Sequence, residues 1–414
     1  MYYLANSNIV ERYEYATDII TSWDGHEQRI KTRNLPRHFL SYEYTALDSY
    51  QAQWLRGVAR MRQNTTMYVP MWHNCSYLSE DFVAHGKALY IEKNCMFNFF
   101  ECDWLEVFSH DDVMQTDNTV RKIFRFSDGM ITLQQKIDCD LLKANTHIFP
   151  LRKMAIRPTN DINYVYSNGT NLSLSFEDLC IPTTISIPYT YIVEFEKAEG
   201  FNLFNLPSTY NNKDVFPIQP QWVDDTSNVL NIGKNTNRLD NSTGVFVYDL
   251  KNSCSYDIHS LSLILMNKES INNVVRFFKR TCGRYLSFYA PSWVNDFELD
   301  RDIRQGTNFL YTKFNHMYKY YLGNNRKKSI VIFTKDRKSY IYDIMSYSYE
   351  TINNIKYGKI TVSEPFSRGF ARSDVLMVSY LNLVRFDHDD LELSYESDIV
   401  ANVNLVLKEV DDDI

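Results

Sequence analysis

Two segments, Met67-Tyr-Val-Pro-Met-Trp72 and Phe288-Tyr-Ala-Pro-Ser-Trp293, close a longer match that decides the expected fold. Residues 36–72 align with residues 257–293 without a gap, at a constant offset (293 − 72 = 221). Seven aligned positions are identical: His38/His259, Leu40/Leu261, Ser41/Ser262, Ser49/Ser270, Tyr68/Tyr289, Pro70/Pro291 and Trp72/Trp293. A gapless match at a fixed offset predicts two copies of one module.

The physical pattern of the two segments repeats as well. Residues 38–45 alternate in character, as in a strand with two unlike faces, and residues 260–265 do the same. A helix-capping signal follows each strand, Asp48 in the first segment and Asn267 in the second. Apolar residues at helical spacing then predict two buried stripes: Leu47, Tyr50, Trp54, Val58 and Met61 in the first helix, and Ile271, Val274, Val275 and Phe278 in the second.

Each segment ends in an aromatic-x-Pro-x-Trp pattern, in which the proline marks the edge or exit of a strand. We therefore treat Pro70, Trp72, Pro291 and Trp293 as repeat-equivalent structural positions. Both tryptophans are expected to be mostly buried, at matching places in the fold.

Short alternating strands with turn residues follow each segment. Residues 121–126 and 130–135 flank Ser127-Asp-Gly129 and predict a hairpin. The other predicted strands are 148–156, 328–333, 339–344, 346–349, 358–363, 381–386, 390–395 and 401–407. The fold class is therefore α+β and predominantly β, with two tandem strand-helix-strand modules, each followed by a small β-barrel or sandwich.

The predicted domains follow from this pattern and from the Asn-, Pro- and Asp-rich stretch at 199–229. They are a first α+β module (1–80), a small β-domain (81–160), a linking segment with short strands (161–229), a second α+β module (230–300), and a second β-domain with C-terminal strands (301–414).

Composition limits the possible classes of protein. The 414 residues carry a formal net charge of −7 and 15% aromatic side chains. Basic residues form only short clusters such as Asn325-Arg-Lys-Lys328, which is interpreted as a solvated turn. We therefore expect no nucleic-acid binding. Seven cysteines without a C-x-x-C pair suit reduced thiols made in a cytoplasm. The sequence predicts neither a signal peptide nor a membrane span.

Candidate chemistry in the sequence is sparse. His388 lies among Asp387, Asp389, Asp390 and Glu392, which could hold a hard cation, but a turn on a solvated face is the favoured interpretation. Trp72-His73-Asn74-Cys75 places a thiol next to an imidazole, although sequence neighbours seldom form a catalytic pair. No nucleotide-binding pattern is present. We therefore predict no catalytic, cofactor-binding or metal-binding residues, and no enzyme activity.

Glu27 and Arg29 lie on a predicted strand, where alternate residues share a face. We interpret them as possible subunit-contact residues that form an ion pair at a subunit seam.

Several motifs, in this order along the chain, resemble tailed-bacteriophage minor tail proteins of the distal-tail or baseplate-hub type. They are Tyr13-Glu-Tyr-Ala-Thr-Asp18, Trp23-Asp-Gly-His-Glu-Gln-Arg29 with Pro36-Arg37, Tyr68-Val-Pro-Met-Trp72, Ile148-Phe-Pro-Leu-Arg152, Phe216-Pro-Ile-Gln-Pro-Gln-Trp222 and Val384-Arg-Phe-Asp-His-Asp-Asp-Leu-Glu-Leu393. The resemblance implies tail-tube-like or distal-tail-like folds and a structural role at the virion tail tip, after synthesis in the bacterial host cytoplasm. It implies partners among the tail tube, hub and fibres.

Three functions stay open at this point. The first is a tail-tip ring or adaptor, either a trimer whose paired modules mimic six-fold contacts or a hexamer of the whole chain. The second is a carbohydrate-binding adhesion module that contacts the host surface through exposed aromatic side chains. The third is a cell-wall hydrolase, which needs paired carboxylates in a cleft. The first accounts best for the repeat together with the missing catalytic motifs.

Overall fold

The structure is a computed structural model of the 414-residue chain. It describes residues 8–22, 26–46, 48–62, 65–91, 99, 102–109, 120–127, 129–157, 162–166, 169–178, 202–221, 228–240, 242–315 and 326–411.

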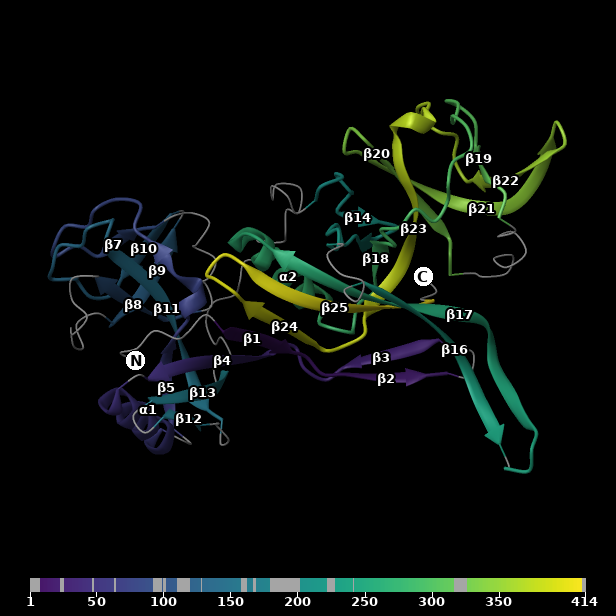
Figure 1. The fold of residues 1–414 in the computed structure, drawn as a ribbon. Coiled ribbons are helices and arrows are strands. Elements are labelled where there is room, and N and C mark those ends of the chain that lie inside the picture. Colours follow the sequence, from purple (N-terminus) through teal and green to yellow (C-terminus); the bar gives the residue numbers. More distant parts are fainter. Residues whose placement is uncertain are drawn as a thin grey trace.

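Antiparallel β-structure dominates the protein (Figure 1), which confirms the predominantly β prediction. The described part of the chain contains two α-helices, α1 (Ser49–Met61) and α2 (Lys268–Thr281). Most strands join one large sheet. Alternation of apolar and polar residues along these strands explains why one face of each is buried.

The first region of the fold comprises residues 9–178. Its sheet strands are β1 (Ile9–Glu14), β4 (Arg37–Ala46), β5 (Thr66–Pro70), β6 (Ser76–Tyr77), β7 (Ala88–Tyr90), β8 (Trp104–Ser109), β9 (Val120–Ser127), β10 (Met130–Leu133), β11 (Thr146–Ile156), β12 (Ile162–Tyr166) and β13 (Gly169–Asp178). The predicted hairpin is confirmed as β9 paired with β10, and Gly129 adopts φ +71° in its turn. Asp128 of that turn lies outside the described residues.

The second region comprises residues 229–409. Its strands are β16 (Val229–Asp240), β17 (Phe246–Leu265), β18 (Phe288–Pro291), β19 (Phe309–Lys313), β20 (Ser329–Thr334), β21 (Ser339–Ile352), β22 (Ile355–Val362), β23 (Val375–Phe386), β24 (Asp390–Tyr395) and β25 (Ala401–Glu409). The strands predicted at 339–344 and 346–349 are one strand, β21, with a shift in pairing between Ile344 and Ser346. A small hairpin of β14 (Thr209–Tyr210) and β15 (Lys213–Asp214) precedes this region.

Within the sheet, strand β1 joins the two regions. β1 pairs antiparallel with β4 of the first region on one side and with β24 of the second region on the other. The resulting layer runs in the order β12-β13-β4-β1-β24-β25-β17-β16. We call the β1–β24 contact the junction. The largest apolar core extends across it, from Leu40 and Leu174 to Leu263 and Leu405.

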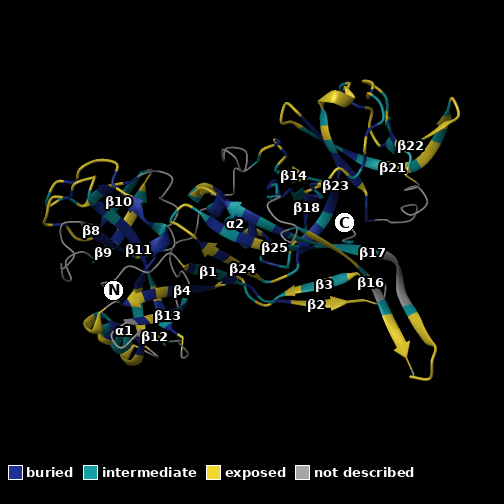
Figure 2. Ribbon diagram, in the orientation of Figure 1, coloured by how far each residue is buried: buried dark blue, intermediate teal, exposed yellow. Residues whose placement is uncertain are grey.

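Two ribbons of two strands leave this layer. The short ribbon, β2 (Thr17–Thr21) with β3 (Glu27–Lys31), follows β1 and lies along the second region (Figure 1). The long ribbon is the part of β16 and β17 between Lys234 and Ser255, and it projects away from the body of the protein. Figure 2 shows its far end as exposed. Leu239, Val247 and Tyr248 are among its exposed residues.

The two helices begin with the predicted caps. The Asp48 side chain accepts a hydrogen bond from the backbone N–H of Gln51 (2.7 Å), and Asn267 accepts one from Ser270 (2.7 Å). In α2 the predicted stripe is confirmed, since Ile271, Val274, Val275 and Phe278 are all buried.

The predicted stripe of α1 is confirmed only in part, since Trp54 and Val58 are half-buried and pack against the core. The helix turns Ala52, Leu55 and Ala59 toward the core, while Tyr50 and Met61 are exposed. Small alanines let the helix lie close to the sheet on that face, so larger apolar residues are left on the rim and on the outer side. Leu47, which the prediction placed in this stripe, lies outside the described residues.

Candidate functional site

A buried carboxylate fixes the short ribbon to the second region. Glu27 on β3 receives a bidentate pair of hydrogen bonds from Arg385 on β23 (2.7 and 2.9 Å) and one from Lys408 on β25 (3.0 Å). Arg29, two residues along the same strand, donates a further hydrogen bond to it (3.3 Å). Three cations therefore surround one carboxylate, and such charge-assisted bonds are strong and directional.

The charges around Glu27 control its protonation. Burial by itself raises the pKa of a carboxyl group, but the hydrogen bond and charge of Arg385, together with those of Lys408, outweigh burial and lower the pKa of Glu27 to about 2. In turn, the same contact raises the pKa of Arg385, although burial of the guanidinium opposes that shift. The ion pair is therefore fully charged at neutral pH.

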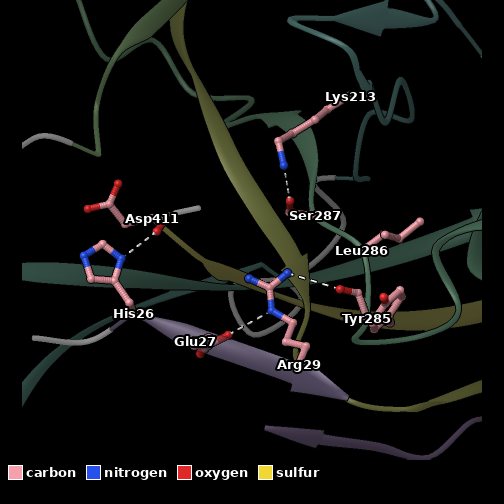
Figure 3. Close-up of a pocket in the computed structure, with 8 residues that line it drawn as sticks. All are labelled: His26, Glu27, Arg29, Lys213, Tyr285, Leu286, Ser287 and Asp411. Atoms are coloured by element: carbon pink, nitrogen blue, oxygen red, sulfur yellow. Dashed lines mark hydrogen bonds and ion pairs between the residues drawn. The ribbon is translucent and has the colours of Figure 1, made fainter. Parts of the chain in front are cut away.

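An open recess of about 470 Å³ lies beside this ion pair (Figure 3). Its polar groups pair with each other across elements from both regions. Arg29 donates to the Tyr285 carbonyl (3.2 Å), Lys213 donates to the Ser287 hydroxyl (2.7 Å), and Nδ1 of His26 lies 3.3 Å from the Asp411 carbonyl oxygen. The lining residues are His26, Glu27, Arg29, Lys213, Tyr285, Leu286, Ser287 and Asp411.

The polar groups of the recess form hydrogen bonds between separate elements of the chain. Its hydroxyl groups belong to Ser287 and Tyr285, and the Ser287 hydroxyl accepts its hydrogen bond from the Lys213 ammonium. Within the described residues, no three His, Cys, Asp or Glu side chains are arranged to hold a metal ion.

A second polar cluster lies buried at the junction, around Glu11 on β1. One oxygen of Glu11 accepts hydrogen bonds from the Tyr13 hydroxyl (2.8 Å) and from Nε2 of His38 on β4 (2.7 Å). The other oxygen accepts one from the Tyr395 hydroxyl on β24 (2.8 Å) and lies 3.4 Å from Nε2 of His73. Strands from both regions therefore share one carboxylate.

The protonation states of this cluster follow from its hydrogen bonds. Arg152 donates to Nδ1 of His38 (3.0 Å), so the proton of this imidazole is on Nε2 and points at Glu11. Burial lowers the pKa of His38, and the charge of Arg152 lowers it further. Burial would raise the pKa of Glu11, but His73 and His38 outweigh burial and hold it well below its usual range. Glu11 is therefore a buried anion that neighbouring side chains satisfy.

Of the four positions predicted to be equivalent in the repeat, the two prolines end strands and the two tryptophans are buried. Pro70 ends β5 and pairs with Leu151 on β11, while Pro291 ends β18 and pairs with Leu381 on β23. Trp72 and Trp293 are both buried. Trp72 meets Phe149 edge to face with ring centres 4.9 Å apart, and Trp293 stacks on Phe333 at 5.2 Å.

The acidic cluster around His388 is a turn between β23 and β24 that holds the junction together. Asp389 accepts hydrogen bonds from the Thr17 backbone N–H (2.7 Å) and hydroxyl (3.0 Å), and from the backbone N–H of Arg284 (3.0 Å). Its carbonyl accepts one from the Tyr15 N–H (2.8 Å). The turn therefore connects β2 to the end of α2.

The side chains of His73 and Cys75 contact different groups. The His73 ring faces Glu11 and lies 4.4 Å from the Tyr395 ring, centre to centre. The Cys75 thiol is buried and lies 3.9 Å from the Ser76 carbonyl oxygen.

The interpretation of residues 325–328 as a solvated turn is wrong for its central residues. Arg326 and Lys327 are buried. Lys327 donates to Asp257 (2.6 Å) and to Asn382 (3.1 Å) and lies 3.1 Å from Glu409. Burial would lower the pKa of Lys327, but the charges of Glu409 and Asp257 outweigh it and raise the pKa. The charge is tolerated inside because carboxylates of two strands surround it.

Glu27 and Arg29 lie two positions apart on β3, so their side chains are on the same face of the strand, and they form an ion pair within the chain. Their use at a subunit contact stays a prediction. Sequence reasoning missed Arg385, Glu11 and Lys408. The available signal was a charged residue at an inward position of an apolar strand, as with Arg385 in Leu381-Asn-Leu-Val-Arg-Phe386.

The sequence matches no protein-family model, and a search among curated proteins gives no match. Within the part of the chain that the structure describes, no helix is both long and apolar enough to cross a membrane.

Proposed function

We propose that the protein contains two copies of one fold and is a structural component of a bacteriophage tail tip. The duplication is supported by strand pairing. The strand pairs of the first region have counterparts in the second region when strands are matched in chain order. In the first region the pairs are β1–β4, β4–β13, β13–β11, β11–β5, β11–β8, β8–β9, β9–β10, β10–β7 and β12–β13. Their counterparts in the second region are, in the same order, β16–β17, β17–β25, β25–β23, β23–β18, β23–β20, β20–β21, β21–β22, β22–β19 and β24–β25.

Register supports the duplication more sharply than strand order does. Pro70 pairs with Leu151 and Met154 with Asp178 in the first region. In the second region Pro291 pairs with Leu381 and Val384 with Glu409. Along the central strand, which is β11 in the first region and β23 in the second, the two pairings are the same distance apart (154 − 151 = 3 and 384 − 381 = 3). The proposed copies therefore match residue by residue where β13 meets β11 and where β25 meets β23.

The histidines at the matched positions 38 and 259 add a chemical likeness. Burial and a nearby cation lower the pKa of each histidine; the cation is Arg152 for His38 and Lys327 for His259. The pKa of His259 falls to about 4. A proximal carboxylate opposes the shift in both cases.

The function we propose is a ring or adaptor that joins the tail tube to the hub, baseplate or fibres by protein–protein contacts. The observation that carries it is the unbroken eight-strand layer, which joins two proposed copies at β1–β24 and leaves β12 and β16 at its ends, each paired on one side within the described residues. A layer built by repeating a module can continue into further modules. The resemblance in sequence motifs supports placement at the tail tip.

The test is the mass of the purified protein by light scattering at several concentrations, followed by electron microscopy of the same sample. We expect a closed ring, and the images show whether the ring contains three chains or six. If phage tails bearing an epitope on this protein show the label anywhere other than the tail tip, the proposed location is wrong.

One observation favours the alternative, a carbohydrate-binding adhesion module. Phe246 and Tyr248 are exposed near the end of the long ribbon with ring centres 5.4 Å apart, and Arg238 lies 4.4 Å above the Phe246 ring. Exposed aromatic faces beside a cation suit sugar rings. A glycan array with wild type and Tyr248→Ala tests this function, which predicts binding that the substitution abolishes.

A further inference from the structure

The junction shows how one region covers the edge of the other. Tyr13 and Tyr15 on β1 and its exit are 6% and 3% exposed. The Tyr15 hydroxyl donates to the Lys279 carbonyl of α2 (3.3 Å), and its ring lies 5.8 Å from that of Phe278. The Lys279 ammonium lies 4.6 Å from the centre of the Tyr13 ring. The second region therefore buries both tyrosines.

The short ribbon extends this cover along the second region. Arg29 binds the Tyr285 carbonyl just beyond α2, and the Lys31 ammonium lies 3.8 Å from the Cys282 sulfur at the end of the helix. Together, β1 and its ribbon bind an edge strand, β24, and the end of a helix, α2.

Among the described residues, no strand covers the corresponding edge of the second region. Val229 pairs with Ser260, and Arg12 pairs with Phe39. Because 260 − 39 = 221, Val229 corresponds to Arg12, Leu230 to Tyr13 and Ile232 to Tyr15. Leu230 and Ile232 are 51% and 71% exposed, whereas the matching tyrosines are buried.

The opposite end of the layer offers the matching surface. β12 corresponds to β24 and, within the described residues, pairs with β13 alone. Helix α1 corresponds to α2, and Met61, which aligns with Cys282 (282 − 61 = 221), is 81% exposed. Gly57 aligns with Phe278, and open space surrounds the position of an added Cβ there. The surface equivalent to the one that receives β1 is thus uncovered.

We propose that β16 and the long ribbon of one chain bind β12 and the end of α1 of a second copy, antiparallel, as β1 and the short ribbon bind β24 and α2 within the chain. The inference rests on the proposed duplication and gives the proposed ring its contact. Each chain uses two different surfaces, so the association is head to tail and can close into a ring.

The structure favours a second copy over an unrelated partner for a geometric reason. The two ends of the layer, β16 and β12, correspond to β1 and β24, which already pair within the chain, so the same kind of contact would serve within and between chains. A two-stranded ribbon with apolar residues on its faces is marginally stable by itself in water and gains stability when covered.

The first experiment compares Ile232→Asp with Met345→Asp by sedimentation over a range of concentrations. Met345, on β21, is 69% exposed and far from both proposed surfaces in the strand order, so it matches Ile232 in exposure. We expect Ile232→Asp to raise the dissociation constant of the assembly by at least about ten-fold, because a carboxylate would be buried without a partner. Met345→Asp should assemble as wild type does.

A second experiment locates the contact without relying on its disruption. Ile232→Cys and Gly57→Cys are made as separate chains, mixed, and treated with a short thiol-to-thiol cross-linker. The mixture should give cross-linked dimers well above the background of wild type and of each variant alone, because Tyr15 and Phe278, the matching residues, are in contact within the chain.

The outcomes separate this inference from the proposed function. If the wild type forms a ring, Ile232→Asp assembles normally and the mixture gives no excess dimer, the contact is wrong and the ring proposal stands. A wild type that remains monomeric up to its solubility limit overturns both.

Discussion

Strands β1 and β16 hold corresponding places in the two regions under the proposed duplication, but their surroundings differ. β1 has a strand on each side and buries a carboxylate and two tyrosines, whereas β16 has β17 on one side and exposes Val229, Leu230 and Ile232. Their backbones are the same kind of structure. The comparison teaches that burial along an edge strand depends on what is docked against it, not on the strand itself.

The helices repeat this difference. Phe278 in α2 is fully buried against the junction, and Met61 at the end of α1 is exposed. Truncating Phe278 to Ala should therefore lower the free energy of unfolding by about 3–5 kcal/mol, from lost burial and a residual cavity. Urea unfolding followed by circular dichroism measures it.

Met61→Ala is the matched control in the first region. In the monomer it should change the free energy of unfolding by less than about 0.5 kcal/mol, as is usual for exposed positions. Similar losses for both variants would show that the end of α1 is packed as tightly as the end of α2, and the comparison would fail.

The ribbons offer the next largest effect. Arg385→Met removes two charge-assisted hydrogen bonds from Glu27, while Lys408 and Arg29 still offset its charge. We expect a loss of about 2–3 kcal/mol in unfolding free energy. Urea unfolding again provides the measurement.

Arg238→Met on the long ribbon is the control, because the Arg238–Asp240 pair (2.8 Å) is largely exposed. Exposed pairs contribute between about 0 and 1 kcal/mol, so the variant should be close to wild type. An equal effect at both sites would mean that the long ribbon is held as firmly as the short one.

Acid should weaken the attachment of the short ribbon to the second region. The pKa of Glu27 falls from 4.5 to about 2 on folding. The unfolded chain thus takes up the proton first, so the stabilisation is complete above pH 4.5 and is lost as the pH falls toward 2. Glu27→Gln should flatten the decline of stability in this window, as measured by urea unfolding at a series of pH values.

Glu43→Gln is the control for this pH dependence. Glu43 is exposed on β4 and makes no contact with Glu27, so its replacement leaves the Glu27 ion pair and the decline of stability that this pair causes in place. If Glu27→Gln and wild type have the same slope, the ion pair does not link the ribbon to protonation.

Substitutions of the helix caps should have the smallest effects on the unfolding free energy, and these effects should be similar in the two regions. Asp48→Ala and Asn267→Ala each remove one side-chain hydrogen bond of 2.7 Å at a helix start. Both should lower the unfolding free energy by about 1 kcal/mol. A large difference between the two would indicate that the helix starts, and not only the helix ends, differ between the regions.

Local patterns sufficed for a large part of the fold. Alternation predicted the C-terminal strands at 390–395 and 401–407, and the structure has β24 and β25 there. The capping residues Asp48 and Asn267 also function as predicted. These features depend on contacts within a few residues, so a single stretch of sequence carries all the information they need.

The candidate site was harder to predict because its members come from distant segments. Glu27 and Arg385 are 358 residues apart, and Glu11 and Tyr395 are 384 apart. Only Glu27 and Arg29 were identified beforehand, from their spacing on one strand. The buried Lys327 was misinterpreted because its partners, Asp257 and Glu409, lie on other strands.

The sequence by itself therefore determined many of the strands, the two helices, their caps and the predominantly β class, because periodicity and capping are local. Only the tertiary structure decided which faces are buried. It turned Ala52, Leu55 and Ala59 of α1 inward, placed Arg385 beside Glu27, and covered β1 while leaving β16 bare. Burial is a property of what packs against a residue, and that partner is set by long-range contacts that a local pattern does not contain.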